Sequence, residues 1–437
     1  MRTRMGVSLC ALLTVFGLAA GAQDQAANSG RQTLKGYSTV KPARQFDFGA
    51  AKEAASKGTG LPIFTYTITA TKDQNIYSGT MVGGSPFARK KVTTNIPAYI
   101  IPVIVVIGTT AFDPTIADTT CMAPPNDVPL TVFRNSPLFV SPAASWVMNG
   151  VNVGTGQYID AFQRANFWTD VGGTPYNVNL SPVTVLTPQT YNVPAQDGNI
   201  ISDSTFGNGG CGPNNNPQGV EGEIYINDFD TWVTGTLLPK YPQITSSTLP
   251  VILLYNVVMG LTQPPNVVEC CVLGYHGATN GPPSGQTYSP MDFDTSGIFG
   301  TGVRDTSASA HEIGEWMNDP YGTNPTPVWS SGQSAACSSG GQNNLEVGDP
   351  LSGLSNDWTV TGANGFTYHM QELVFFSGST TPIMSLRSAP VAGFRITGRL
   401  KGPRNLVRRA GLTPTNRHAR KWESGFAALP RLPVQLS

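Results

Sequence analysis

The sequence predicts an α+β fold, in which a mixed β-sheet packs against helices, with a β-rich N-terminal portion and long loops. Two long apolar runs, residues 95–107 and 250–259, are rich in Val and Ile and predict buried strands. Apolar residues spaced along one helical face predict a helix at 157–168, and capping residues at 305–307 followed by Pro320 predict a helix at 306–318. The chain contains 48 Gly and 35 Pro, and only 12% of its residues are charged, which is typical of a turn-rich protein.

The N-terminus has the features of a secretory signal peptide in residues 1–22. Two arginines among the first four residues supply the positive start, residues 5–20 are mostly apolar, and the small residues at 20–22 form a cleavage site. We therefore expect a secreted or periplasmic protein. No later segment has 18 uninterrupted apolar residues, so no membrane span is expected.

Residues 23–60 are polar and weakly patterned, so we expect a linker there. The β-rich N-terminal portion then spans residues 61–249. Apolar residues alternate with threonines at 64–68, which predicts a half-buried strand. Pro102, within the apolar run at 95–107, lacks a backbone N–H, so we expect it near a sheet edge or a bulge.

Residues 250–377 form the next predicted portion, built around the helix at 306–318, here called the motif helix. A short apolar run at 271–276 predicts another buried strand, and the segment at 368–376 predicts a final helix. Pro320 cannot continue a helix, so the motif helix is expected to end just before it.

Residues 378–437 form a basic tail whose composition differs from the rest. They contain 11 Lys and Arg but one acidic residue, whereas residues 23–377 contain 14 basic and 26 acidic residues. Basic tails can bind nucleic acid or anionic surfaces, but this one begins abruptly and has no clear periodicity, so nucleic-acid binding is not expected. We hypothesise that a reading-frame shift begins near Ser377 and that the tail is not native. The hypothesis fails if neither alternative frame of the gene continues the Gly-, Asn- and aromatic-rich pattern.

Five cysteines remain after removal of the signal peptide, which contains Cys10. They are Cys121, Cys211, Cys270, Cys271 and Cys337. Two disulfides and one thiol are the simplest arrangement in an exported protein. The adjacent Cys270 and Cys271 are expected to bond elsewhere, because a vicinal disulfide is strained. A cysteine zinc site is the competing interpretation, but the sequence has no C-x-x-C pair to support it.

The motif His311-Glu312-x-x-Glu315 lies on the motif helix. His311 and Glu315 are four residues apart, so both side chains project from one helix face, as two ligands of one metal ion require. Glu312 lies beside them and could polarise a metal-bound water as a general base. Gly314 costs about 1 kcal/mol of helix propensity relative to Ala, which predicts close packing against a neighbouring backbone.

A catalytic zinc site needs a third protein ligand. Glu346 and Asp349 are the downstream candidates, and calcium binding or turn formation is the alternative role for this acidic pair. His276 is a further candidate, as a ligand or as a donor to an oxyanion, with a structural histidine as the alternative. Asp319, at the helix end, is expected to cap the helix or to orient His311 by a hydrogen bond.

Other residues have simpler interpretations than metal binding. Glu315 could be solvated or paired with Arg304, and the whole motif could be accidental in an all-β adhesion-type protein. Asp292 and Asp294 are interpreted as loop residues, with a calcium role as the alternative. Trp316 is interpreted as a core residue.

The motif helix, the Asp-Pro pair that follows it and the downstream Glu346-x-x-Asp349 resemble the zincin superfamily of metallopeptidases, in particular a secreted bacterial group with His-Glu-x-x-Glu. The resemblance covers about residues 250–377 and implies a zincin-like mixed sheet packed on a metal-binding helix. It also implies a zinc-dependent peptidase acting on peptide or protein substrates. In the gluzincin branch the third zinc ligand is a downstream Glu, which corresponds to Glu346. The sequence departs from the usual pattern at Glu315, where a second His is common, and this changes the charge and metal preference of the site.

We therefore expect an exported metal-dependent hydrolase of peptide bonds. In this interpretation His311, Glu315 and Glu346 bind zinc, and Glu312 activates the water that attacks the carbonyl. The alternative is a catalytically inactive secreted protein that keeps the zincin fold and binds cell-wall or matrix components. The altered ligand at Glu315 favours this alternative.

Overall fold

The structure is a computed structural model of the 437-residue chain. It describes residues 37–41, 48–69, 73–86, 88, 92–119, 121, 127–142, 145–148, 151–166, 174, 176–202, 219–264, 270–279, 285–299, 303–329, 342–349 and 357–371. The predicted signal peptide, the basic tail and three cysteines (Cys10, Cys211 and Cys337) lie outside the described residues.

The main sheet is an 11-stranded sheet with parallel and antiparallel pairs, so the mixed α+β class is confirmed. Its strands follow the order β10 (Gly198–Ser202), β11 (Val220–Tyr225), β13 (Val257–Gly260), β14 (Val272–Ala278), β15 (Thr287–Phe293), β12 (Leu249–Tyr255), β4 (Val92–Ile107) and β5 (Thr110–Phe112). Beside this path, β1 (Tyr37–Lys41) pairs with β14, and β8 (Tyr176–Val185) and β9 (Gln189–Asn192) pair with β4. The strand β12 is parallel to both β4 and β15, whereas β14 is antiparallel to β13 and β15.

The central strand β12 is buried on both faces. Val251 and Leu253 join one apolar cluster, whereas Ile252 and Leu254 join another, because successive side chains of a strand point to opposite faces. A strand of this kind has a continuous apolar sequence. This is why the runs containing β4 and β12 were recognisable in the sequence.

Pro102 was predicted to lie near a sheet edge or a bulge, but it lies in the middle of the strand β4, inside the main sheet. On one side, β4 pairs with β8 as far as Ile100 and with β9 from Val103 onward. Pro102 therefore falls between two partner strands. Its missing N–H costs no ladder hydrogen bond at this gap, so proline is tolerated in a central strand.

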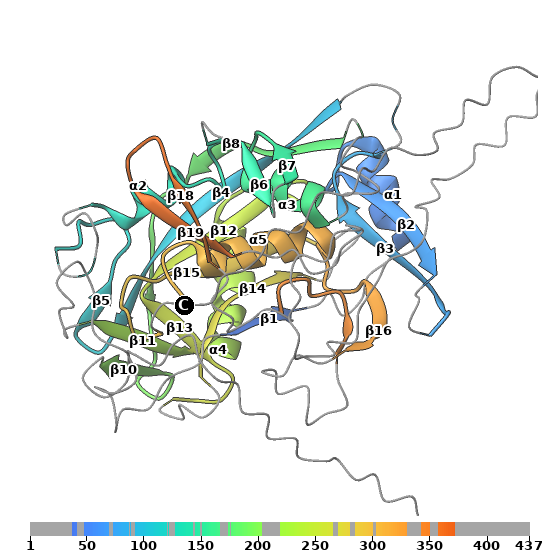
Figure 1. Cartoon of the computed structure of the whole chain (residues 1–437). Coiled ribbons are helices and arrows are strands. Elements are labelled where there is room, and N and C mark those ends of the chain that lie inside the picture. The colour runs from blue at the N-terminus through green and yellow to red at the C-terminus, as the bar shows by residue number, and fades with distance from the viewer. Residues whose placement is uncertain are drawn as a thin grey trace, which may run out of the picture. The chain divides into compact units, whose positions relative to one another are not determined.

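Helices cover both faces of the main sheet. On one face lie α2 (Pro129–Arg134), α3 (Tyr158–Asn166) and α5 (Ser307–Asn318). On the opposite face lies α4 (Ile226–Trp232), continued by a π-helical turn (Val233–Leu237) and a 3-10 turn (Leu238–Lys240). The helix α5 packs on β14 and β15, and Figure 1 shows it in orange beside these strands. No helix within the described residues is long and apolar enough to cross a membrane.

Smaller antiparallel sheets flank the main sheet. They are β2 (Ile63–Thr69) with β3 (Ile76–Val82), β6 (Trp146–Met148) with β7 (Val151–Gly154), β16 (Pro325–Trp329) with β17 (Gln342–Asn344), and β18 (Asp357–Thr361) with β19 (Thr367–Gln371). In β2, Phe64 and Tyr66 are buried while Thr67 is exposed, so the predicted half-buried strand is confirmed.

Two predicted segments have a different structure. Residues 23–60, expected to be a linker, contain β1 and the helix α1 (Phe48–Lys57), which buries the small side chains of Ala51 and Ala54. The predicted helix at 368–376 is wrong where the structure describes it, because this segment begins within the strand β19. Tyr368 and Met370 are buried on alternate positions of β19, a period of two that fits a strand.

The predicted strand at 250–259 is two strands separated by Asn256. Asn256 has a positive φ of 49°, a conformation that Asn adopts more readily than most residues. Its side-chain Oδ1 accepts a hydrogen bond from Thr295 N at 2.7 Å. At this residue the chain leaves its pairing with β4 and β15 and, as β13, pairs with β11 and β14.

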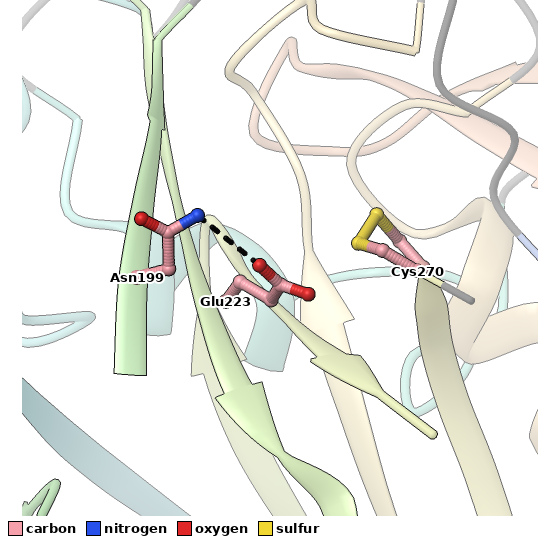
Figure 2. Close-up of a disulfide and its surroundings, with 4 residues drawn as sticks. Asn199, Glu223 and Cys270 are labelled. Carbon is pink, nitrogen blue, oxygen red and sulfur yellow. Dashed lines mark hydrogen bonds between the residues drawn. A yellow bond between two sulfur atoms is a disulfide. The ribbon is translucent and has the colours of Figure 1, made fainter. Parts of the chain in front are cut away.

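Cys270 and Cys271 form a vicinal disulfide, so the expectation that they bond elsewhere is wrong. Both side chains are buried in a small apolar cluster that includes Ile298. The other described cysteine, Cys121, is itself disulfide-bonded. Figure 2 shows the disulfide in the same view as Glu223 of β11, which accepts a hydrogen bond from Asn199.

Candidate metal centre

The helix α5 carries the His311-Glu312-x-x-Glu315 motif and is buried along its whole length. It begins at Ser307 and ends at Asn318, within a residue of the predicted bounds. Asp319 follows it and accepts hydrogen bonds from Thr323 N at 2.9 Å and Asn324 N at 2.8 Å. Asp319 is therefore the C-cap of α5, which confirms the first of its two predicted roles, and the structure describes no hydrogen bond between it and His311.

Two glycines outside α5 allow neighbouring backbone to approach the motif closely. A Cβ on Gly274 of β14 would lie 2.8 Å from Glu312 Cγ. A Cβ on Gly348, in the loop after β17, would lie 2.5 Å from His311 Cε1. Neither position can hold a side chain without moving the motif residue. The backbones of β14 and of this loop therefore pack closely against the side chains of the motif.

His311 has a fixed orientation in this centre. Its Nδ1 lies 2.6 Å from Gln371 Oε1, a carbonyl oxygen that can only accept, so Nδ1 carries the proton. In neutral imidazole this leaves the lone pair on Nε2, the form that binds metals. His311 Nε2 lies 3.0 Å from Glu315 Oε1 and 3.5 Å from Asp349 Oδ1, yet it makes no hydrogen bond of acceptable geometry.

The loop after β17 is attached to α5 through Glu315. Glu315 Oε1 accepts hydrogen bonds from Gly348 N at 2.8 Å and Asp349 N at 3.2 Å. The alternative in which Glu315 is solvated or paired with Arg304 is therefore wrong, since Glu315 is fully buried and Arg304 is exposed.

His276 of β14 lies among the remaining acidic side chains. Its Nδ1 is 3.3 Å from Glu312 Oε2 and 3.8 Å from Glu315 Oε2, and its Nε2 is 3.9 Å from Glu346 Oε2. Asn344 Nδ2 donates to the other oxygen of Glu346 at 2.6 Å. His276 is thus part of the cluster, although the sequence favoured no particular neighbour for it.

All six candidate residues meet in one buried cluster, and none is more than 6% exposed. Several of their polar atoms have no hydrogen-bond partner: His276 Nε2, His311 Nε2, Glu312 Oε1, Glu315 Oε2 and Glu346 Oε2. Ligand atoms of His276, Glu312 and Glu315 lie within 4.8 Å of one another, and so do those of His311, Glu315 and Asp349. Buried polar atoms without partners are costly, and these atoms are of the types that bind metals. The cluster could therefore hold a metal ion.

The pKa values of the acidic residues in the cluster also indicate that a cation could bind there. Burial raises the pKa of Glu346 well above its usual value, and the neighbouring Glu315 and Asp349 raise it further. Burial also raises the pKa of Glu312. Burial acts to raise the pKa of Glu315 too, but His311 outweighs it and lowers this pKa to about 2. Four buried carboxylates share two imidazoles, and a divalent cation would balance the excess negative charge.

One residue of the centre, Gln371, was missed in the sequence. It orients His311, but it lies in β19, which the sequence predicted to be a helix. The alternation of apolar residues at 368 and 370 was the signal that could have placed Gln371 on a strand, although not beside the motif helix.

Comparison with known proteins finds no match: no protein-family model, no curated protein and no solved structure is similar to this chain.

Proposed function

We propose that the chain is an exported, metal-dependent hydrolase of peptide bonds whose centre binds one zinc ion. The observation that carries the proposal is the buried group of His311, Glu315 and Asp349, whose ligand atoms lie within 4.8 Å of one another beside other buried polar atoms without partners. Mixed imidazole and carboxylate ligands suit zinc, whereas calcium and magnesium prefer oxygen ligands alone. Export follows from the signal-peptide pattern of residues 1–22.

We assign His311, Glu315 and Asp349 as the zinc ligands. The separations from His311 Nε2 are 3.0 Å to Glu315 Oε1, which also accepts two backbone hydrogen bonds, and 3.5 Å to Asp349 Oδ1. Two ligands of a tetrahedral zinc ion with bonds of about 2.0 Å lie about 3.3 Å apart, so both separations suit one ion. Glu346, the ligand that the gluzincin resemblance implies, lies beside His276 and takes a supporting role in this assignment.

Glu312 is the general base in this proposal. Zinc, when bound, would lower the pKa of a water molecule and polarise the substrate carbonyl. Glu312 Oε1 is unpartnered and can accept the proton of the attacking water, while its Oε2 is oriented by His276 Nδ1 at 3.3 Å. Burial raises the pKa of Glu312, although the hydrogen bond to His276 and the charge of His311 act in the opposite direction.

His276 supplies a hydrogen-bond donor in the same proposal. Burial lowers its pKa, but the hydrogen bond to Glu312 and the charges of nearby carboxylates outweigh burial and raise it. Protonated His276 can donate from both ring nitrogens, so Nε2 remains available while Nδ1 contacts Glu312. An oxyanion that forms on the substrate would be stabilised by this donor.

The ligand assignment predicts different effects for two matched substitutions. We expect Asp349→Asn to weaken zinc binding at least about 100-fold, because it removes an anionic ligand beside His311. We expect Glu346→Gln to weaken zinc binding by about 10-fold or less, because it alters a neighbour of His276. Competition of each variant with a chromogenic chelator measures both affinities. The reverse order of the two effects would assign Glu346 as the ligand, as in gluzincins.

A substitution behind His311 tests the same site without touching a ligand. In Gly348→Ala, the new Cβ would overlap the His311 ring, so we expect the ring to shift and the zinc affinity to fall about 10- to 100-fold. Gly235→Ala is the control, since a Cβ at Gly235 has no atom within 4 Å. Equal zinc affinity for both variants would show that the orientation of His311 is unimportant for binding.

A second candidate function is supported by the burial of the centre. Glu312 and His276 are fully buried, whereas a hydrolase must admit a substrate to its base. In this candidate, zinc serves to stabilise a non-catalytic exported protein that binds cell-wall or matrix components. Zinc binding without hydrolysis of any member of a fluorogenic peptide library would favour it over the hydrolase.

A further inference from the structure

A second group of acidic side chains lies in the main sheet and shares no residue with the centre on α5. Glu221 comes from β11, Asp292 from β15, and Asp294 follows directly after β15. One carboxylate oxygen from each residue lies within 4.8 Å of the other two. All three residues are buried, with at most 2% exposed. The interpretation of Asp292 as a loop residue is wrong, because it lies within a central strand.

Backbone groups hold two of these carboxylates in place. Asp292 Oδ1 accepts a hydrogen bond from Val257 N at 3.1 Å, and Asp294 Oδ1 accepts one from Ser296 N at 2.7 Å. The second oxygen of each, Oδ2, is buried and has no hydrogen-bond partner. Each aspartate is therefore anchored by one oxygen and keeps the other available to a ligand.

Glu221 provides an independent indication of a ligand. It comes from a different strand and is fully buried, and neither of its carboxylate oxygens faces a basic side chain; the Ser296 hydroxyl and the Asp292 carboxyl are its polar neighbours. Within the described residues, no Lys, Arg or His forms an ion pair with Glu221, Asp292 or Asp294. A group of three buried carboxylates without a cation is strongly unfavourable.

The charges in this group add to that cost. Burial raises the pKa values of Glu221 and Asp292 well above their usual range, and the charge of Asp294 raises both further. Burial also raises the pKa of Asp294, to about 6. A bound cation would remove the penalty in all three.

We propose that Glu221, Asp292 and Asp294 form a structural site for a hard divalent cation, and that Ca²⁺ is its preferred ion. Three carboxylates and no nitrogen or sulfur ligand suit Ca²⁺, Mg²⁺ or Mn²⁺. Mg²⁺ usually keeps several water ligands, whereas Ca²⁺ accepts a largely protein-made shell, as the burial of this group requires.

The site has a defined structural role. It joins β11 to β15, two strands that are not neighbours in the sheet. It also lies where the chain leads toward α5, because the carbonyl of Asp294 accepts a hydrogen bond from the backbone N–H of Asp305, just before the helix. An ion bound here would hold the segment just before α5 against the sheet, without involving the zinc ligands.

Calcium titration of the zinc-loaded, full-length protein tests the proposal. After treatment with a calcium-selective chelator, we expect CaCl2 to bind with one site per chain in calorimetry. At a concentration about 100 times the Kd, we expect it to raise Tm by about 4 °C. MgCl2 at the same concentration is expected to raise Tm by less. An unchanged Tm and no heat of binding with CaCl2 would overturn the proposal, and this measurement needs no variant.

A pair of matched variants locates the bound ion. Glu221→Gln is expected to abolish the calcium-dependent rise in Tm, whereas Glu223→Gln, two residues further along β11, should keep it. Glu223 is a suitable control because its Oε2 already accepts a hydrogen bond from Asn199, which a glutamine oxygen can also accept (Figure 2). The opposite result has two parts: the Tm of the wild type does not change with calcium, and Glu221→Gln raises Tm in the presence of chelator. In that case the three residues are protonated acids and do not bind an ion.

Discussion

Replacing Glu312 with glutamine is expected to lower kcat for peptide hydrolysis by about 1,000-fold and to leave the zinc content unchanged. The amide keeps the size of the carboxylate but cannot accept the proton of the attacking water. Glu312 lies beside the assigned ligands without being one of them, so zinc binding should survive. Turnover of a fluorogenic peptide library and elemental analysis of the same preparation measure the two effects.

The control for this substitution is Glu53→Gln, which makes the same chemical change at an exposed site on α1. It should match the wild type in turnover and zinc content. Full activity in Glu312→Gln would remove Glu312 from the mechanism. Loss of zinc together with activity would instead identify Glu312 as a ligand. Its Oε2 lies 3.3 Å from His276 Nδ1, a separation that two ligands of one zinc ion can have.

Replacing Glu315 with glutamine is expected to remove zinc from the protein, from about one ion per chain to less than about 0.1. The amide oxygen can still accept the hydrogen bonds from Gly348 N and Asp349 N, so the loop after β17 should stay in place. The variant therefore separates the loss of a charged ligand from the loss of the loop. Elemental analysis after gel filtration gives the zinc content.

The same substitution should also lower the stability of the metal-free protein. Glu315 is buried beside His311. Burial acts to raise the pKa of Glu315, but the contact with His311 outweighs burial and lowers this pKa to about 2. Removing one partner of a buried charge pair costs about 3–5 kcal/mol of the free energy of unfolding. Urea denaturation in the presence of chelator measures this loss. A variant that keeps zinc and full stability would contradict the assigned role of Glu315.

The central parts of the fold were predictable because their local signals agree with their tertiary environment. The strands β4 and β12 are buried on both faces, which gives a continuous apolar sequence. The helix α5 was located by the spacing of His311 and Glu315 and by Pro320 after it. Its full burial was not apparent, since Ser307 and Ser309 are polar residues in a buried first turn.

Features that depend on contacts distant in sequence could not be predicted. Gln371 reaches His311 only because β19 packs beside α5, and Glu221 meets Asp292 only because of the strand order. Whether Glu346 or Asp349 lies beside His311 depends on the path of the loop after β17, which passes close to the His311 ring at Gly348. Spacing along the chain carries no information about any of these three arrangements.

Anomalous diffraction at the zinc absorption edge, from crystals grown with zinc, shows directly whether the cluster on α5 binds zinc. We expect one strong peak per chain within about 2.0–2.2 Å of His311 Nε2, Glu315 and Asp349. No peak in the cluster on α5, or a peak bound only by surface residues, would contradict the claim that this helix carries a zinc centre.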